Sequence, residues 1–214
     1  YTTCTAMCAE ATTLAGVEHD CSSDALAANS IKTVITDMMH SGAQSLLQLV
    51  GAKGYRRDHL AGSAVVDSRP FQIFEGSNDI LYEQISDSVL KSMRRFKEDN
   101  LHRFVAAFDK TRRAAERLRG LLDISLSGEL PQRKKVDLGR ILGRVISLDM
   151  VLALADRGYR RDLIDTTTEI LRRDIAALLG SFTSGNQEKS VEDYREGSSW
   201  LDFLPDRPAR TLRG

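Results

Sequence analysis

Hydrophobic residues recur every three or four positions along most of this chain, which is the period of α-helices that bury one face. The clearest case runs over residues 24–50, where Leu26, Val34 and Met38 share one apolar stripe. No segment alternates apolar and polar positions in the way that marks a β-strand. The pattern therefore predicts an all-α fold with short connections. The predicted helices cover residues 1–15, 24–50, 77–97, 101–124, 132–158 and 160–182, with a short helical turn around 61–67.

These helices fall into two sets that meet near residue 100. We expect residues 1–99 to form one helical bundle, truncated at its N-terminus, and residues 100–182 to form a second, smaller bundle. Residues 17–21 are predicted to be a polar link, and 183–214 a tail rich in Ser, Gly, Asn and charge. Because the chain starts with Tyr1 inside an apparent helix, we expect it to be a piece of a longer protein.

Composition is ordinary for a soluble globular protein, with 42% hydrophobic and 28% charged residues in 214. The formal net charge is zero, so global charge implies no polyanionic partner. No run approaches the roughly 18 apolar residues that a membrane-spanning helix needs, and no signal or transit peptide is visible. We therefore expect a cytoplasmic protein, or one of the mitochondrial matrix if the source is eukaryotic.

All three cysteines, Cys4, Cys8 and Cys21, lie in the first tenth of the chain. An odd number in one region does not make a disulfide framework and favours a reducing compartment. Cys4 and Cys8 are one helical turn apart, but no second pair of ligands completes a tetrahedral site. We predict structural thiols and no metal site.

The chemistry concentrates in residues 48–85, between the two longest helical patterns of the first set. Glu75 stands just before a predicted helix start, after the apolar run Phe71–Phe74, which we expect to bury its approach, and before the flexible Gly76. The plainer interpretation is a surface glutamate at a helix N-terminus, where carboxylates are favoured. Gly51 and Gly54 likewise have a plain interpretation as a glycine helix terminus.

This stretch resembles the acyl-CoA dehydrogenase family. The family carries a Gln-x-x-Gly-Gly-x-Gly-aromatic turn, an Arg-Asp pair, and a Gln-Ile-(Tyr/Phe)-Glu-Gly-(Thr/Ser) segment. The matching segments here are QLVGAKGY (48–55), VD (66–67) and QIFEGS (72–77). The run FEGSNDIL (74–81) is most similar to the very-long-chain branch, and the resemblance covers about residues 24–92. The chain departs from the family pattern at Ala52, Leu60, Val66 and Pro70.

The resemblance implies a specific role for Glu75. It would take the α-proton of an acyl-CoA thioester while FAD takes the β-hydride, and its backbone N–H would stabilise the thioester oxygen. Such a base needs a raised pKa, which a dry pocket around the bound substrate would supply against the helix dipole. Phe74 and Gly76, on either side of Glu75, are the implied substrate-binding residues.

The resemblance also implies a shared cofactor site. Gln48, Gly51 and Ala52 would contact the FAD of a neighbouring subunit, and Ser77 and Asp79 would contact FAD beside the catalytic base. The protein would then be a homodimer or homotetramer that passes electrons to an electron-transfer flavoprotein or a similar acceptor. The family's N-terminal helical and middle β-domains are absent from this sequence, so we expect the chain alone to be inactive.

Two other functions stay open. Residues 91–135 hold thirteen Lys or Arg against six Asp or Glu, and one branch of similar proteins, the alkylation-response proteins, associates with DNA. A solvated helix face is the commoner origin of such a charge run, and Phe96, Phe104 and Phe108 fall at helical spacing rather than between the charges, so we do not expect nucleic-acid binding. The third possibility is a cofactor-free helical interaction module.

Overall fold

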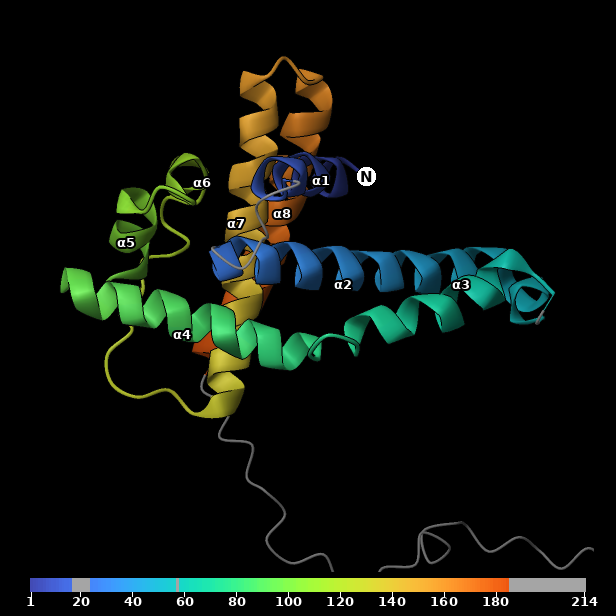
Figure 1. The fold of residues 1–214 in the computed structure, drawn as a ribbon, viewed down its shortest axis with the longest axis horizontal. Helices are drawn as coiled ribbons and strands as arrows, with labels where there is room; N and C mark the ends of the chain where they lie inside the picture. The colour runs from blue at the N-terminus through green and yellow to red at the C-terminus, as the bar shows by residue number, and fades with distance from the viewer. Residues whose placement is uncertain (17–23, 57, 185–214) are drawn as a thin grey trace, which may run out of the picture. The chain divides into compact units, whose positions relative to one another are not determined.

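The computed structural model describes residues 1–16, 24–56 and 58–184, and it confirms the all-α class (Figure 1). The link predicted at residues 17–21 and the tail from residue 185 onwards lie outside the described residues. Within the described part there is no β-strand, and Asn100 and Ser125 form an isolated β-bridge. The helices are α1 (Thr2–Leu14), α2 (Ala25–Val50), η2 (Gly51–Tyr55), α3 (Leu60–Ser68), η3 (Arg69–Gln72), α4 (Asn78–Phe96), α5 (Leu101–Ala107), α6 (Arg112–Arg117), α7 (Gln132–Asp156) and α8 (Arg161–Thr183).

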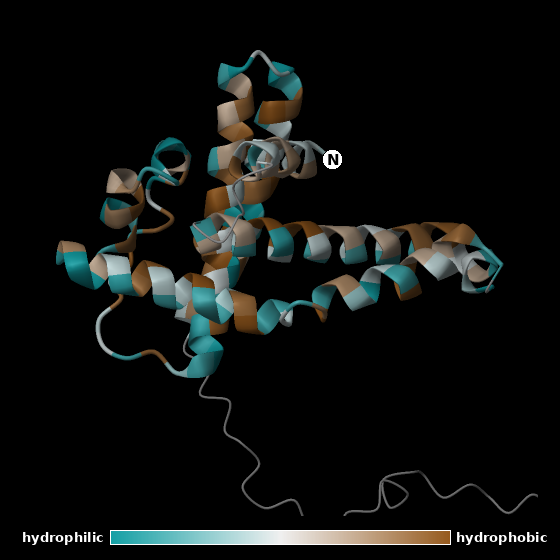
Figure 2. Ribbon diagram, in the orientation of Figure 1, coloured by the Kyte–Doolittle hydropathy of each residue, from teal (hydrophilic) through white to brown (hydrophobic). Residues whose placement is uncertain are grey.

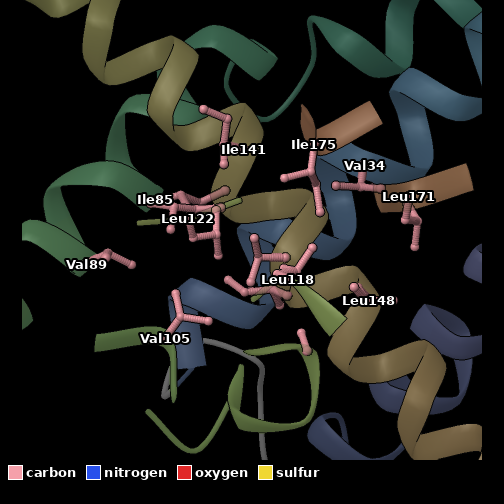
Figure 3. Close-up of a cluster of buried hydrophobic side chains, with 14 of the residues drawn as sticks. Val34, Ile85, Val89, Val105, Leu118, Leu122, Ile141, Leu148, Leu171 and Ile175 are labelled. Atoms are coloured by element: carbon pink, nitrogen blue, oxygen red, sulfur yellow. The ribbon is translucent and has the colours of Figure 1, made fainter. Parts of the chain in front are cut away.

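Helix α7 is the centre of the hydrophobic core. It contacts α1, α2, α4, α6 and α8, and its buried side chains meet those of α2, α4 and α8 in one cluster (Figure 3). Two of its partners, α4 and α8, are strongly amphipathic, and α4 shows hydrophobic and hydrophilic bands in Figure 2. The fully buried side chains of the shared core include Val34, Tyr82, Ile85, Ile141, Leu148 and Ile175.

The boundary expected near residue 100 does not separate two compact units, because Tyr1–Ser184 form one unit. The physical reason is that α7 buries residues on nearly every side, including Leu138, Ile141 and Leu142, and so supplies core to the helices before residue 100. Its contact with α4 is close enough that a Cβ built on Gly139 would come within 2.0 Å of the Tyr82 carbonyl oxygen. Glycine at this position lets the two backbones touch.

One predicted helix is wrong. Residues 101–124 form two short helices, α5 and α6, instead of one. Between them Phe108 is extended, and the Thr111 hydroxyl donates to the Val105 carbonyl oxygen at 2.8 Å. The Asp149 carboxylate of α7 then accepts the backbone N–H groups of Arg113 (2.7 Å) and Ala114 (3.2 Å). A tertiary contact therefore caps α6 and starts a new helix where the local periodicity predicts continuation.

Helices α2 and α3 carry the chemically distinctive segment. Asp24 caps α2 by accepting the Ala27 N–H at 3.2 Å, and the distal half of α2 runs beside α3 away from α7 and α8 (Figure 1). After α3 the chain passes through η3 to the start of α4, which crosses in front of α7 (Figure 1). Among the described helices, none is long and apolar enough to span a lipid bilayer.

Candidate functional site

Glu75 lies in a turn with an uncommon backbone. The turn follows η3, whose first residues include Pro70, and the N–H groups of Ile73 and Phe74 both donate to the Pro70 carbonyl oxygen at 2.9 Å. Glu75 then adopts a φ of 57° and Gly76 a φ of 94°, so two consecutive residues are left-handed. Glycine adopts this conformation readily, whereas for a glutamate the left-handed backbone costs about 1–2 kcal/mol in conformational free energy. Helix α4 begins immediately afterwards, so Glu75 is presented at its N-terminus.

Solvent-exposed apolar side chains surround this turn. Phe71 is 56%, Ile73 53% and Phe74 65% exposed, and Glu75 is exposed with them. The expectation that the run Phe71–Phe74 buries the approach to Glu75 is therefore wrong for this chain alone. The run lies in η3 and the turn after it, which contact α2 and α3, and the three apolar side chains remain largely in solvent there. An open hollow of about 550 Å³ lies beside it, with apolar walls from α3 and η3 and polar side chains from α2.

Lys32 of α2 forms hydrogen bonds that attach the Glu75 turn to α2. Its ammonium donates to the Gly76 carbonyl oxygen at 2.9 Å and to the Asn78 side-chain oxygen at 2.8 Å. Burial lowers the pKa of Lys32 below its ordinary value, while the carboxylates of Glu75 and Asp37 act in the opposite direction. The residue that follows Glu75 is thus tied to a helix more than forty positions earlier in the chain.

Asp37, one and a half turns further along α2, is the hub of a polar cluster. One carboxylate oxygen accepts from Gln72 Nε2 at 2.8 Å and from Asn78 Nδ2 at 2.6 Å. The other accepts from the Tyr82 hydroxyl at 2.6 Å, which in turn accepts from Arg144 Nη1 at 2.5 Å. We call this cluster the Asp37 network, and its members are Lys32, Asp37, Gln72, Asn78, Tyr82 and Arg144.

The Asp37 network is largely shielded from solvent. Tyr82 is fully buried and Asn78 is 7% exposed. Burial raises the pKa of Tyr82 well above its ordinary range, with Asp37 acting in the same direction and Arg144 opposing it. The tyrosine hydroxyl consequently stays protonated and able to donate to Asp37 at any physiological pH.

The turn formed by Gln48, Gly51 and Ala52 lies at the other end of α3 from Glu75 (Figure 1). Gln48 and Ala52 are exposed, and Gly51 has a φ of 69° with open space where a Cβ would point. Gly54 is buried, and a Cβ on Gly62 of α3 would come within 2.7 Å of its carbonyl oxygen. The turn is therefore held tightly against α3 on one side and is open on the other.

Ser77 and Asp79 have different surroundings. Ser77 is the N-cap residue of α4 by its backbone, yet its side chain makes no capping hydrogen bond. Asp79 accepts from Arg140 Nη2 of α7 at 2.9 Å, with its side chain 55% exposed. The structure therefore brings Phe74, Glu75, Gly76, Ser77 and Asp79 together at the start of α4, and places Gln48, Gly51 and Ala52 apart from them.

Several Lys and Arg side chains of residues 91–135, which we call the basic stripe, form ion pairs. Arg103 pairs with Glu98 at 3.2 Å, Arg113 with Asp149 at 3.2 Å and Asp156 at 3.1 Å, and Lys135 with Asp87 at 3.0 Å. Lys110 also contacts Asp24. Acidic partners from α4, α7 and the start of α2 thus offset part of the positive charge that stands out in the sequence. No group of three potential metal ligands occurs within the described ranges.

Reasoning from the sequence missed the Asp37 network. Lys32 and Asp37 are two of several polar residues of an otherwise ordinary helix, and Asn78 is the first residue of α4, where a polar side chain is common. A polar pair five residues apart on one helix is a weak signal. Nothing in the local sequence indicates that Arg144, from a different helix, completes the cluster.

Comparison with known proteins gives one match. Residues 2–90, which extend from α1 into α4, match the family model described as acyl-CoA dehydrogenase, C-terminal domain. The matched segment contains both the Glu75 turn and the Gln48–Ala52 turn, and it ends before α5. No curated protein and no solved structure matches the chain.

Proposed function

We propose that α1–α4 of this chain are the C-terminal helical domain of an FAD-dependent acyl-CoA dehydrogenase, most similar to the very-long-chain branch. The observation that carries the proposal is Glu75: a carboxylate held in a left-handed turn at a helix N-terminus, within the segment that matches this family. Glu75 is exposed at the start of α4 and is therefore accessible to a ligand bound there. That position suits a base that must reach a bound substrate.

In this proposal Glu75 removes a proton from the α-carbon of an acyl-CoA thioester. The Glu75 backbone N–H stabilises the negative charge that develops on the thioester oxygen, and Phe74 and Gly76 contact the acyl group. The carboxylate is exposed in this chain, so the desolvation that raises its basicity arises only when substrate and the rest of the protein cover the turn.

The residues present fit a flavin in two places. Gly51 offers a glycine backbone with open space around its Cβ position, beside the exposed Gln48 and Ala52, as close approach to a pyrophosphate requires. Ser77 and Asp79 lie at the N-terminus of α4, next to Glu75. FAD, when bound, supplies the hydride acceptor for the β-carbon. The separation of the two sets along α3 is compatible with their facing different FAD molecules in an oligomer.

Exposed apolar side chains on α2, α3 and η3 support the proposal that this chain functions in a larger assembly. Besides the run around Phe71, Leu49 is 86% and Val66 71% exposed. Exposed apolar surface of this extent usually marks an interface. We infer that further domains and a neighbouring subunit cover it in a homodimer or homotetramer, located in the cytoplasm or in the mitochondrial matrix of a eukaryote. An electron-transfer flavoprotein or similar acceptor reoxidises the flavin.

The test is Glu75→Gln in the intact protein, as its host produces it and loaded with FAD. We expect dye reduction by long-chain acyl-CoA to fall about 10²- to 10⁴-fold, because the base is lost. The flavin absorbance should be unchanged. Glu116→Gln, which alters an exposed carboxylate of α6, should leave both properties at the parent level. Full activity in Glu75→Gln would remove Glu75 from the mechanism.

Two outcomes would favour the other functions. An intact protein that carries no flavin would favour a cofactor-free interaction module. Salt-sensitive binding of duplex DNA, lost on neutralising Arg112, Arg113 and Arg117, would favour the DNA-associated alternative. The ion pairs of the basic stripe weigh against that alternative.

A further inference from the structure

Two side chains of α2 hold the Glu75 turn from both sides. Asp37 accepts the side-chain amide of Gln72, three residues before Glu75, at 2.8 Å. Lys32 donates to the carbonyl oxygen of Gly76, one residue after Glu75, at 2.9 Å. The three residues from Ile73 to Glu75 thus lie between two residues that are hydrogen-bonded to the same helix.

A continuous chain of hydrogen bonds links this clamp to α7. Lys32 donates to Asn78 Oδ1 (2.8 Å), and Asn78 donates to Asp37 (2.6 Å). Tyr82 donates to the same carboxylate (2.6 Å) and accepts from Arg144 (2.5 Å). Arg144 is mostly buried, lies outside the segment that matches the family model, and is itself held by Asp174 of α8 at 3.2 Å.

We propose that the Asp37 network is a positioning device for Glu75, in which Lys32 is the residue that fixes the turn and Arg144 anchors the device to α7. The proposal rests on the proposed function for its catalytic meaning. Its structural part, that these two residues order the turn, stands independently.

The need for such a device follows from the backbone. Two consecutive left-handed residues, one of them glycine, are easily replaced by other conformations unless the surroundings hold them. Few core contacts are available to do this, because Phe71, Ile73 and Phe74 are exposed. The hydrogen bonds to Lys32 and Gln72 therefore provide much of the restraint. One has a charged donor, the Lys32 ammonium, and the other has a charged acceptor, the Asp37 carboxylate. Such hydrogen bonds are stronger than those between neutral groups.

The first experiment uses the 214-residue chain and needs no cofactor. Backbone ¹⁵N relaxation is measured at Glu75 and Gly76 in the parent, Lys32→Met, Arg144→Met and Lys32→Arg. We expect order parameters of about 0.85 in the parent to fall below about 0.6 in Lys32→Met, and by less in Arg144→Met. Lys32→Arg retains a donor and should stay near the parent value. Arg133→Met, which removes an exposed arginine of α7 paired with Asp137, is the matched control and should change nothing.

Unchanged order at Glu75 and Gly76 in Lys32→Met would overturn the proposal. The four variants must first show the far-UV circular dichroism of the parent. If Arg144→Met is too unstable to give spectra, Tyr82→Phe removes the hydroxyl between Asp37 and Arg144 and keeps the buried ring. The direct ion pair of Arg144 with Asp37 at 3.6 Å remains, so this variant should lower the same order parameters by less than Lys32→Met does.

The second experiment uses the intact, FAD-loaded protein and separates the proposal from the proposed function. A positioning role predicts a fall in kcat of about 10- to 100-fold for Lys32→Met with KM nearly unchanged, because a base displaced by about 1 Å loses rate rather than substrate binding. Lys32→Arg should recover most of the rate. Lost order in the first experiment together with no dehydrogenation by the parent would refute the proposed function and leave the positioning role intact. Lost order with an unchanged kcat in Lys32→Met would overturn the catalytic part of the proposal.

Discussion

At the scale of single residues, the backbone of Glu75 is the feature that most distinguishes this chain. Its φ of 57° places a long, charged side chain in a conformation that favours glycine or asparagine. Lys97 is the other non-glycine residue with a positive φ among the described residues, and there the reason is ordinary. It ends α4 with a left-handed cap whose N–H donates to the carbonyl oxygens of Arg94 and Met93. Glu75 caps no helix, so its strain is not explained by secondary structure.

We expect Glu75→Gly to raise the free energy of unfolding of the 214-residue chain by about 0.5–1 kcal/mol, since glycine removes the left-handed penalty but costs some backbone entropy. Glu75→Ala keeps the penalty and should leave the stability within about 0.5 kcal/mol of the parent. Lys97→Gly should stabilise by a similar amount to Glu75→Gly. Urea unfolding measures all three, and equal stabilities of the glycine and alanine variants at position 75 would show that the turn stores no strain.

At the scale of secondary-structure elements, the contact between α4 and α7 contributes to the placement of the Glu75 turn. Both helices carry polar residues that meet, Tyr82 with Arg144 and Asp79 with Arg140. Their backbones touch at Gly139, and a Cβ on Gly143 would come within 3.3 Å of the Tyr82 ring. The start of α4, and therefore Glu75, is fixed by this interface as much as by α2.

Gly139→Ala should separate α4 from α7, because the new methyl group would meet the rigid Tyr82 backbone instead of a movable side chain. We expect a loss of about 3 kcal/mol or more in the free energy of unfolding. Gly42→Ala is the control: this glycine is exposed in the middle of α2 with nothing near its Cβ position, so alanine should stabilise by about 0.5–1 kcal/mol. Guanidinium unfolding compares the two, and a mild effect of Gly139→Ala would mean that the helices shift apart without loss.

At the scale of the whole molecule, residues 1–184 share one hydrophobic core. Val34, Tyr82 and Ile85, all from the part before residue 100, are completely buried and belong to the same core cluster as the buried side chains of α7. We therefore expect the segment that matches the family model to depend on α7 for its packing.

A chain that ends after residue 97 should fail to unfold cooperatively. Removing α7 exposes apolar faces of α1, α2 and α4 together, and what remains is expected to be helical but loosely packed. Thermal melts followed by circular dichroism and the binding of a hydrophobic dye test this. Residues 1–184 are the control and should melt in a single transition. A sharp transition in the shorter chain would contradict the role given to α7.

The local sequence determined the helices with strong periodicity and the place of the candidate chemistry. Helices α2, α4, α7 and α8 begin and end within about two residues of the predicted positions, because apolar stripes and glycine stops are local signals. The cluster from Phe74 to Asp79 at the start of α4 is one continuous segment, so its residues had to lie together. The roles predicted for these residues stay predictions.

Tertiary structure alone decided the rest. Asp149 splits residues 101–124 into two helices, because a distant carboxylate outcompetes the continuing helix for the N–H groups of Arg113 and Ala114. Arg144 completes the Asp37 network from more than sixty residues beyond Tyr82. The exposure of Phe71, Ile73 and Phe74 follows from where η3 lies, not from their hydrophobicity. Periodicity records which face of a helix is apolar, but the partner of a polar side chain is set by packing between segments that are far apart in the chain.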